Sequence, residues 1–146
     1  MHLLILCRSD LLDRHVIESA LAQGHDLTLF APTKGDFHRY PEARLIVGDR
    51  LTEHYKLAGH RWDAAIDLSA RTPKQMSVTT AVLASQVAHY ILVSSAWVLE
   101  HPWTHGMDES APTQRLTPEE AAADELTVDN FAGLLAECER ILVDHC

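Results

Sequence analysis

The sequence contains no segment that is both long and apolar. Its apolar stretches, such as Leu3–Leu6 and Tyr90–Val93, are far shorter than the roughly 20 residues that a membrane-spanning helix requires. The N-terminus also lacks the basic segment and the apolar core of a secretory signal. These absences predict a soluble protein that neither spans a membrane nor enters the secretory pathway.

Cysteines and basic residues are both few. The three cysteines, Cys7, Cys138 and Cys146, are widely spaced and form no CxxC pair, which favours a reduced, cytoplasmic location. The chain has 12 lysines and arginines against 21 aspartates and glutamates, so its net charge is −9. A chain this acidic is not expected to bind nucleic acid or an anionic membrane surface.

The sequence does contain a regular alternation of strand and helix patterns. With 146 residues, 47% of them apolar, it is long enough for one domain with its own core. Apolar runs and helical spacing predict strands at 3–6, 26–30, 44–47, 62–68 and 90–93, helices at 12–23 and from 73, helical turns at 51–57 and a last helix from 131. This order predicts a Rossmann-like, three-layer αβα domain over 1–146 with a five-stranded parallel sheet and a long active-site-type loop at 96–127.

Glycine is missing where such a fold needs it most. In a dinucleotide-binding domain, the turn between the first strand and the first helix carries glycines, which let the backbone approach a pyrophosphate. Here those positions hold Cys7, Asp10 and Asp13. Two hypotheses remain open for the aspartates: solvated carboxylates at a helix N-terminus, which the helix dipole favours, or groups that face a ligand other than a dinucleotide.

Several short motifs, each weak alone, occur together in a specific order. They are Leu12 with Arg14–Val16, Gly24–Phe30, Gly48–Arg50, Arg61–Asp63, Ile66–Asp67, Tyr90–Ser95, Asp108–Glu109, Ala111–Pro112 and Cys138–Arg140. In this order the chain resembles the N-terminal half of the extended short-chain dehydrogenase/reductase family, in its NAD-dependent epimerase/dehydratase branch. The resemblance implies a chain that lacks the C-terminal substrate domain of the family. It also implies a homodimer built on the helices at 73–88 and 128–144.

The departures from this family concern its redox chemistry. Relatives carry a GxxGxxG turn, all of whose glycines are replaced here, and a YxxxK pair that falls on Phe131 and Leu135. Phenylalanine has no hydroxyl to act as an acid or base, and leucine cannot lower the pKa of a neighbour. The family's catalytic serine remains as Ser95, whereas the tyrosine four residues later is Leu99. We therefore predict that the chain uses no dinucleotide cofactor.

A ligand is still expected in the crevice at the carboxyl ends of the strands. The predicted lining residues are Arg8, Ser9, Asp10, Asp67, Ser69, Arg71, Ser94, Ser95 and Trp97, with His101, Trp103, His105, Asp108 and Glu109 from the loop beyond. Serine, histidine and carboxylates beside aromatic rings suffice for proton transfer. The sequence thus favours a cofactor-independent isomerase, cyclase or lyase acting on a small molecule, with His101 or His105 as base and Ser95 as hydrogen-bond donor. Arg8 or Arg71 would be the anion partner.

Two alternatives remain. The first is a non-catalytic binding or regulatory protein that kept the fold, in which Trp97 and Trp103 cover the exposed edge of the sheet; the enzyme is narrowly favoured over it. An unusual NAD(P)-dependent reductase is the least favoured alternative, because several of its requirements fail together. His101 and His105 have the spacing of a metal pair, but Pro102 opposes a helix between them and no third ligand is fixed, so no metal is predicted.

Overall fold

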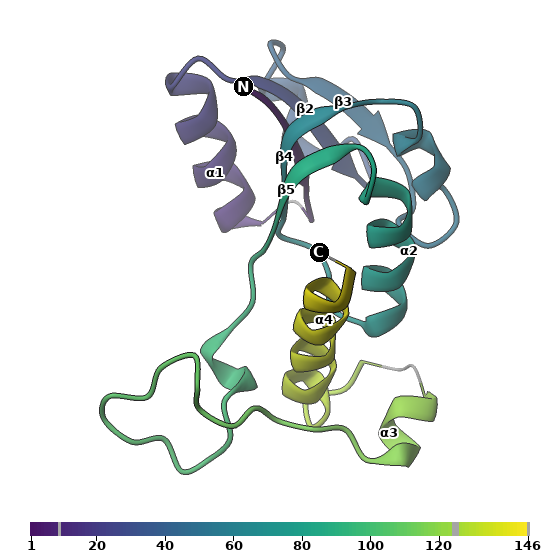
Figure 1. Cartoon of the computed structure of the whole chain (residues 1–146). Coiled ribbons are helices and arrows are strands. Elements are labelled where there is room, and N and C mark those ends of the chain that lie inside the picture. The colour runs from purple at the N-terminus through teal and green to yellow at the C-terminus, as the bar shows by residue number, and fades with distance from the viewer. Residues whose placement is uncertain (9, 124–125, 146) are drawn as a thin grey trace. The chain divides into compact units, whose positions relative to one another are not determined.

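The computed structural model describes residues 1–8, 10–123 and 126–145, with the backbone alone for 121–123 (Figure 1). The chain divides into two compact units. Unit 1 comprises Met1–Ser69 and Val78–Val93, and unit 2 comprises Ala70–Ser77 and Ser94–Cys146. Among the described residues, no helix combines the length and the apolar character needed to cross a bilayer.

Unit 1 is built on a five-stranded parallel sheet, as the sequence predicts. Its strands are β1 (His2–Leu6), β2 (Asp26–Ala31), β3 (Arg44–Val47), β4 (Trp62–Asp67) and β5 (Val87–Leu92). Their order across the sheet is β3-β2-β1-β4-β5, so β3 and β5 are the edges. In the central pair, Leu3 to Leu6 of β1 pair with Ala64 to Asp67 of β4. The buried residues of β1 explain its continuous apolar run, because a central strand needs apolar side chains on both faces.

Two hydrophobic clusters cover the two faces of this sheet. On one face, Leu3 and Ile5 pack with Ile17 of α1 (Leu11–Ala22). On the other face, Leu4 and Leu6 pack with Leu83 at the end of α2 (Pro73–Leu83). The period of two along β1 therefore sends alternate leucines to opposite layers, which is the αβα arrangement visible in Figure 1.

The element boundaries differ from the predicted ones mainly at the end of α2 and at β5. The resemblance implied a helix over 73–88, but α2 ends at Leu83, and residues 87 and 88 belong to β5. This strand begins at Val87, three residues before the predicted start at Tyr90, because its first residue already pairs with Trp62 of β4. Two 3-10 helices, η1 (Gly35–Arg39) and η2 (His54–Leu57), connect the strands. Gly24 follows α1 with a positive φ of 76°, as predicted for the residue that ends this helix.

Unit 2 contains η3 (Ala96–Val98), α3 (Pro118–Ala123) and α4 (Phe131–His145). The sequence predicts one long loop over 96–127, but this stretch contains η3, α3 and an antiparallel bridge between Leu99 and Thr113. Short elements of this kind give no sustained periodicity, so the sequence pattern does not reveal them.

Candidate functional site

The candidate site of unit 1 lies at the carboxyl ends of β1 and β4. The strand order reverses between these two neighbours, and ligands of open α/β sheets bind at such a switch point. Four predicted site residues follow these strands: Arg8 and Asp10 after β1, and Asp67 and Ser69 at the end of β4. Ser9, which was also predicted to line the crevice, lies outside the described residues.

Asp10 and Asp13 form a reciprocal cap at the N-terminus of α1. One carboxylate oxygen of Asp10 accepts hydrogen bonds from the backbone N–H groups of Leu12 at 3.0 Å and of Asp13 at 3.1 Å. In return, the carboxylate of Asp13 accepts from the backbone N–H groups of Arg8 at 2.7 Å and of Asp10 at 3.2 Å. The side chain of Arg8 adds a 3.1 Å ion pair to Asp10. The backbone N–H groups of this turn therefore donate to carboxylates of the same segment.

The cap corrects the prediction of two solvated carboxylates. Asp13 is only 1% exposed, whereas Asp10 is partly exposed. Burial opposes the ionisation of Asp10, but hydrogen bonds from Asp13, Arg8 and Leu12 outweigh it and lower the pKa of Asp10 below its ordinary value. Asp10 is thus an anion at neutral pH, held where the fold would otherwise receive a pyrophosphate.

These residues do not fit a dinucleotide. The N–H groups that would face its pyrophosphate already donate to Asp10 and Asp13, and two carboxylates in a partly dry site repel a further anion. The thiol of Cys7, at the first glycine position, is buried, and this burial together with the charges of Asp13 and Asp10 raises its pKa far above the usual range. A neutral, buried thiol offers no reactive group at this position.

On the β4 side of the switch point, Arg50 joins residues of β4, α2 and β5. Its guanidinium donates to both carboxylate oxygens of Asp67, at 2.8 Å for Oδ1, and to the Ser69 hydroxyl at 2.9 Å. It also donates to Thr79 of α2 at 2.8 Å and to the Tyr90 hydroxyl of β5 at 3.4 Å. Tyr90 in turn donates to Asp67 at 2.5 Å. We call Arg50, Asp67, Ser69, Thr79 and Tyr90 the Arg50 cluster.

The Arg50 cluster is a buried ion pair rather than a proton-transfer site. The side chains of Arg50 and Asp67 are 10% and 0% exposed. Burial disfavours the charge on Asp67, but the charge and hydrogen bonds of Arg50 prevail and keep the pKa of Asp67 below its ordinary value. Burial and the charge of Asp67 raise the pKa of Tyr90, so its hydroxyl stays protonated. Groups with such shifted pKa values keep one protonation state near neutral pH, which does not suit acid–base catalysis.

Sequence reasoning named Asp67 and Ser69 as ligand-binding residues but missed Arg50 and Tyr90. A carboxylate at the end of a strand that is buried on both faces needs a cationic partner, so the position of Asp67 could have indicated that such a partner exists. The sequence could not show that the partner is Arg50, which is 17 residues away.

A hollow of about 350 Å³ lies beside α1 in unit 1. Its apolar lining comes from Leu11, Ile17, Phe37 and Tyr40, and its charged lining from Asp10, Asp13, Arg14, Asp36 and Arg39. Two arginines there take part in surface ion pairs, Arg14 with Glu18 at 2.8 Å and Arg39 with Asp36 at 3.5 Å. The hollow therefore combines an apolar surface with charges of both signs.

The remaining predicted site residues belong to unit 2. They are Arg71, Ser94, Ser95, Trp97, His101, Trp103, His105, Asp108 and Glu109. The Ser95 hydroxyl accepts from the backbone N–H of Trp97 at 3.3 Å, which caps η3. Asp108 accepts from the N–H and the hydroxyl of Ser110 at 2.9 and 2.6 Å, and these bonds lower its pKa. His105 is exposed.

No hydrogen bond joins Ser95, His101, His105 and Asp108 to one another within the part of the chain that the structure describes. His101 instead stacks on Trp103, with ring centroids 4.6 Å apart. Within that same part, no three histidine, cysteine, aspartate or glutamate side chains come together as ligands for a metal ion. Ser95, His101 and Asp108 thus each make a separate local contact, and His105 is exposed.

Three other positions of unit 2 complete the predicted set. The guanidinium of Arg71 lies 5.8 Å from the ring centroid of Phe131, where relatives would carry the catalytic tyrosine. Leu135, at the position of their lysine, is buried in α4. The Ser94 hydroxyl is buried and has no hydrogen-bond partner among the described residues.

Comparison with known proteins identifies the fold. No family model matches the chain, and no curated protein sequence does. Among solved structures, a UDP-galactose 4-epimerase matches 99% of this chain with a TM-score of 0.78 and 13% identity. A UDP-glucose 4-epimerase from Bifidobacterium longum, solved with NAD+ and UDP, matches 99% with a TM-score of 0.74 and 17% identity.

A short-chain dehydrogenase/reductase superfamily protein from Agrobacterium tumefaciens, solved with NAD, also matches 99% of the chain, with a TM-score of 0.73 and 14% identity. The matches extend over 51%, 48% and 45% of these three proteins, so the chain spans about half their length. This chain therefore has the Rossmann-like fold that these epimerase and short-chain dehydrogenase/reductase structures share.

Proposed function

We propose that this chain is a small-molecule-binding protein that uses the dehydrogenase fold without a dinucleotide. The observation that carries the proposal is the reciprocal cap of Asp10 and Asp13 at the N-terminus of α1. The structural neighbours include proteins solved with NAD bound, and in this fold the pyrophosphate belongs at that helix end. Here two carboxylates occupy the backbone donors, so a bound dinucleotide would have to displace them.

The hollow beside α1 is the proposed ligand site. Its volume, about 350 Å³, falls within the roughly 300–1,000 Å³ of small-molecule pockets, and its apolar surface with a few charged groups is typical of them. Arg39 and Asp36 both line the hollow and have opposite charges, and the distance between Arg39 Nη2 and Asp36 Oδ2 is 3.5 Å. Such an exposed pair is weak and opens at little cost, which leaves both charges available to a ligand. The expected ligand is a small zwitterion with an apolar part, such as an amino acid.

A cofactor-independent acid–base enzyme is the second candidate. It is favoured by the exposed imidazoles of His101 and His105 within one segment of unit 2. It is less favoured because two of its other members have structural contacts: the Ser95 hydroxyl caps η3, and Asp108 closes a turn with Ser110. A homodimer stays a prediction too, and sedimentation equilibrium would test it.

Calorimetric titration tests the first part of the proposal. NAD+, NADH, NADP+ and NADPH are titrated separately into the protein, and no binding is expected up to about 1 mM, since the pyrophosphate position carries two anions. Binding of any of the four at micromolar concentration would overturn the proposal.

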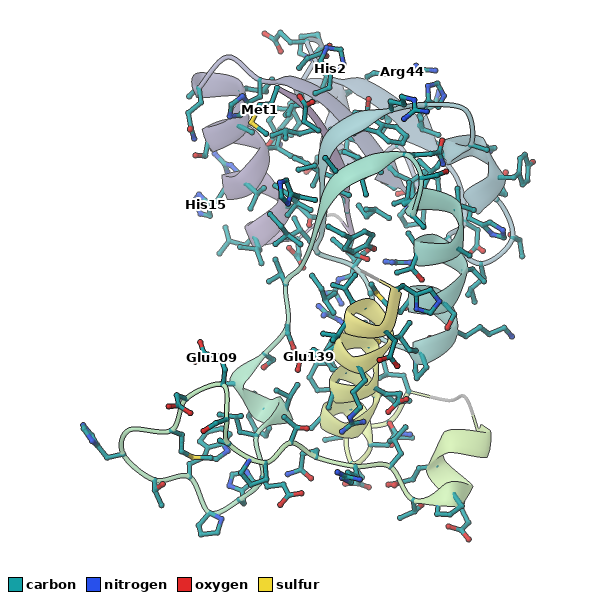
Figure 2. The ribbon with its side chains drawn as sticks, in the orientation of Figure 1. Met1, His2, His15, Arg44, Glu109 and Glu139 are labelled. Atoms are coloured by element: carbon teal, nitrogen blue, oxygen red, sulfur yellow. The ribbon has the colours of Figure 1, made fainter. Side chains whose placement is uncertain are left out.

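A thermal-shift series tests the hollow. Apolar and aromatic amino acids are expected to raise the melting temperature of the wild type but not that of Arg39→Gln, which removes a charge from the hollow. Arg44→Gln is the matched control, because Arg44 is exposed on β3 and does not line the hollow (Figure 2). Equal shifts in both variants would show that the amino acids act elsewhere.

A further inference from the structure

The loop that follows η3 in unit 2 exposes two tryptophans side by side. Trp97 is 62% exposed and Trp103 is 46% exposed. Their ring centroids lie 6.0 Å apart, and their planes are nearly perpendicular, at 86°. Large aromatic side chains that are exposed in a cluster usually mark a binding surface, because their exposure to water costs free energy. We call Trp97 and Trp103 the tryptophan corner.

Local contacts hold the tryptophan corner in place. The indole N–H of Trp103 donates to the Leu99 carbonyl at 3.3 Å, and the imidazole of His101 stacks on the Trp103 ring with 16° between the planes. The backbone N–H of Trp97 donates to the Ser95 hydroxyl at 3.3 Å. Because the rings are oriented before any ligand arrives, less conformational entropy is lost on binding.

The base of the loop is also fixed. The backbone N–H of Glu100 donates to the Pro112 carbonyl at 2.9 Å, and that of Gln114 donates to the Val98 carbonyl at 2.7 Å. From α4, Arg140 donates to the Gln114 carbonyl at 2.7 Å. These bonds connect the two ends of the loop, whose path through unit 2 before α3 can be followed in Figure 1.

The charged side chains within this loop are acidic. Between Ala96 and Gln114 the sequence contains Glu100, Asp108 and Glu109 but no lysine or arginine, whereas Arg115 follows directly and Arg140 of α4 donates to the base of the loop. All three carboxylates are exposed, and Figure 2 shows Glu109 on the loop. The loop itself therefore has a negative charge, which favours a cation over an anion, in a chain whose net charge is −9.

We infer that the tryptophan corner binds a trimethylammonium group. The face of an indole ring attracts a cation, and the rings of Trp97 and Trp103 are nearly perpendicular, so a cation against the face of one ring lies near the other ring as well. A trimethylammonium group suits this site better than an ordinary ammonium, because its methyl groups pack on the rings and it holds water less tightly. The group can belong to a free choline-like molecule or to a trimethylated lysine of a partner protein. This inference does not depend on the ligand proposed for the hollow of unit 1.

Tryptophan fluorescence with matched probes tests the inference. Choline is titrated against 3,3-dimethylbutan-1-ol, which has the same shape but no charge. Choline is expected to bind at least tenfold more tightly, a ratio that corresponds to about 1.4 kcal/mol. Equal affinities would overturn the inference, because they would reveal a merely apolar patch, and so would the absence of choline binding.

Three variants locate the site. Trp97→Leu and Trp103→Leu should each weaken choline binding at least tenfold, whereas Tyr55→Leu should not, since Tyr55 is an equally exposed aromatic residue of unit 1. Trp97→Phe keeps an aromatic face and should retain most of the affinity for choline. If it does so while Trp97→Leu loses the affinity, the loss comes from the missing aromatic ring and not from misfolding. Unchanged binding in both leucine variants would overturn the inference.

A final pair of probes separates the two sources. A short neutral peptide with trimethyllysine is compared with the same peptide carrying unmodified lysine. Tighter binding of the methylated peptide than of choline supports a protein partner, and tighter binding of choline supports a free small molecule. Equal binding of the methylated and unmodified peptides would overturn the inference, since it would show attraction to charge alone.

Discussion

Two regions differ in the surroundings of their candidate functional side chains: the carboxyl end of the sheet in unit 1 and the loop after η3 in unit 2. In unit 1, charged groups are bonded within the chain: the carboxylates of Asp10 and Asp13 accept from backbone N–H groups at the start of α1, and the Arg50 cluster is a buried ion pair. In unit 2, the aromatic rings of Trp97 and Trp103 are exposed, and so are the acidic residues near them in the sequence. The polar groups of the first region are therefore bonded to other groups of the chain, whereas the side chains of the second region are exposed to solvent.

This difference indicates where a ligand can bind. A buried carboxylate must find its partners inside the protein, because an unpaired buried charge costs several kcal/mol. Once Asp67 is bonded to Arg50, neither group can serve a ligand without leaving the other unpaired. An exposed indole ring has no such requirement, and although His101 stacks on Trp103, both tryptophans keep a large exposed surface. In this molecule, carboxylates of the chain thus occupy the usual ligand position of the fold, whereas the exposed aromatic surface lies in unit 2.

Breaking the Arg50 cluster should have the largest effect. Arg50→Met leaves Asp67 buried without its counter-charge and should lower the free energy of unfolding by about 3–5 kcal/mol, measured by urea denaturation. Replacing Asp67 and Tyr90 as well, with Leu and Phe, should restore much of this loss, because no buried charge then remains.

The exposed pair of Arg14 and Glu18 provides the control for Arg50. Its Nε–Oε1 distance is 2.8 Å, yet Arg14→Met should change the stability little, since solvent screens exposed ion pairs. If both methionine variants were equally stable, burial would not be the property that distinguishes the Arg50 cluster.

Acid should break the same cluster without mutation. The pKa of Asp67 is held below the value of about 3.9 that it has in an unfolded chain, so the folded state binds this proton less tightly. The stabilisation is then complete above about pH 4 and is lost as the pH falls through the folded-state pKa. Urea denaturation between pH 7 and pH 3 should show this loss in the wild type and a weaker pH dependence in Asp67→Asn. A steeper dependence in the variant would contradict the assignment.

The cap of α1 should show an intermediate effect. Asp13→Ala removes the bonds to the Arg8 and Asp10 N–H groups and should cost about 2–3 kcal/mol, because a charged acceptor is lost from a buried position. Asp10→Ala should cost about 1 kcal/mol, as is usual for an N-cap residue. Thermal unfolding measures both, and a larger effect for Asp10 than for Asp13 would mean that the buried partner is not the dominant one.

The smallest effect is expected in unit 2. Ser95→Ala removes the single hydrogen bond from the Trp97 N–H and should cost less than about 1 kcal/mol, because the bond caps one short, exposed helical turn. Choline binding at the tryptophan corner should weaken slightly, because Trp97 becomes less fixed. A loss of stability comparable to that of Arg50→Met would remove the contrast between the two regions.

Much of the fold could be predicted from the sequence, because local patterns carry it. The apolar run Leu3–Leu6 predicts a central strand, and Leu3 to Leu6 do pair with β2 and β4 on either side. Gly24 ends α1 as predicted. Periodicity did not predict η3 and α3, because these elements are short, or the first residues of β5, because they form no continuous apolar run although they pair with β4.

The candidate sites were harder to predict, since they depend on which polar groups meet. The sequence named Asp10, Asp67, Trp97 and Trp103 among the site residues, but it gave no sign that Asp13 is buried or that Arg50 reaches Asp67. It also left open whether His101 acts as a base, whereas the structure stacks this imidazole on Trp103.

By itself, the sequence determined the alternation of strands and helices, the parallel sheet and the absence of glycine from the first turn, because periodicity and residue type act over short distances. Only the tertiary structure decided that Asp13 is buried, that Arg50 neutralises Asp67, and that Trp97 and Trp103 are both exposed. The capping box of Asp10 and Asp13 is local in the sequence, but burial and the pairing of Arg50 with Asp67 are set only when distant segments pack together.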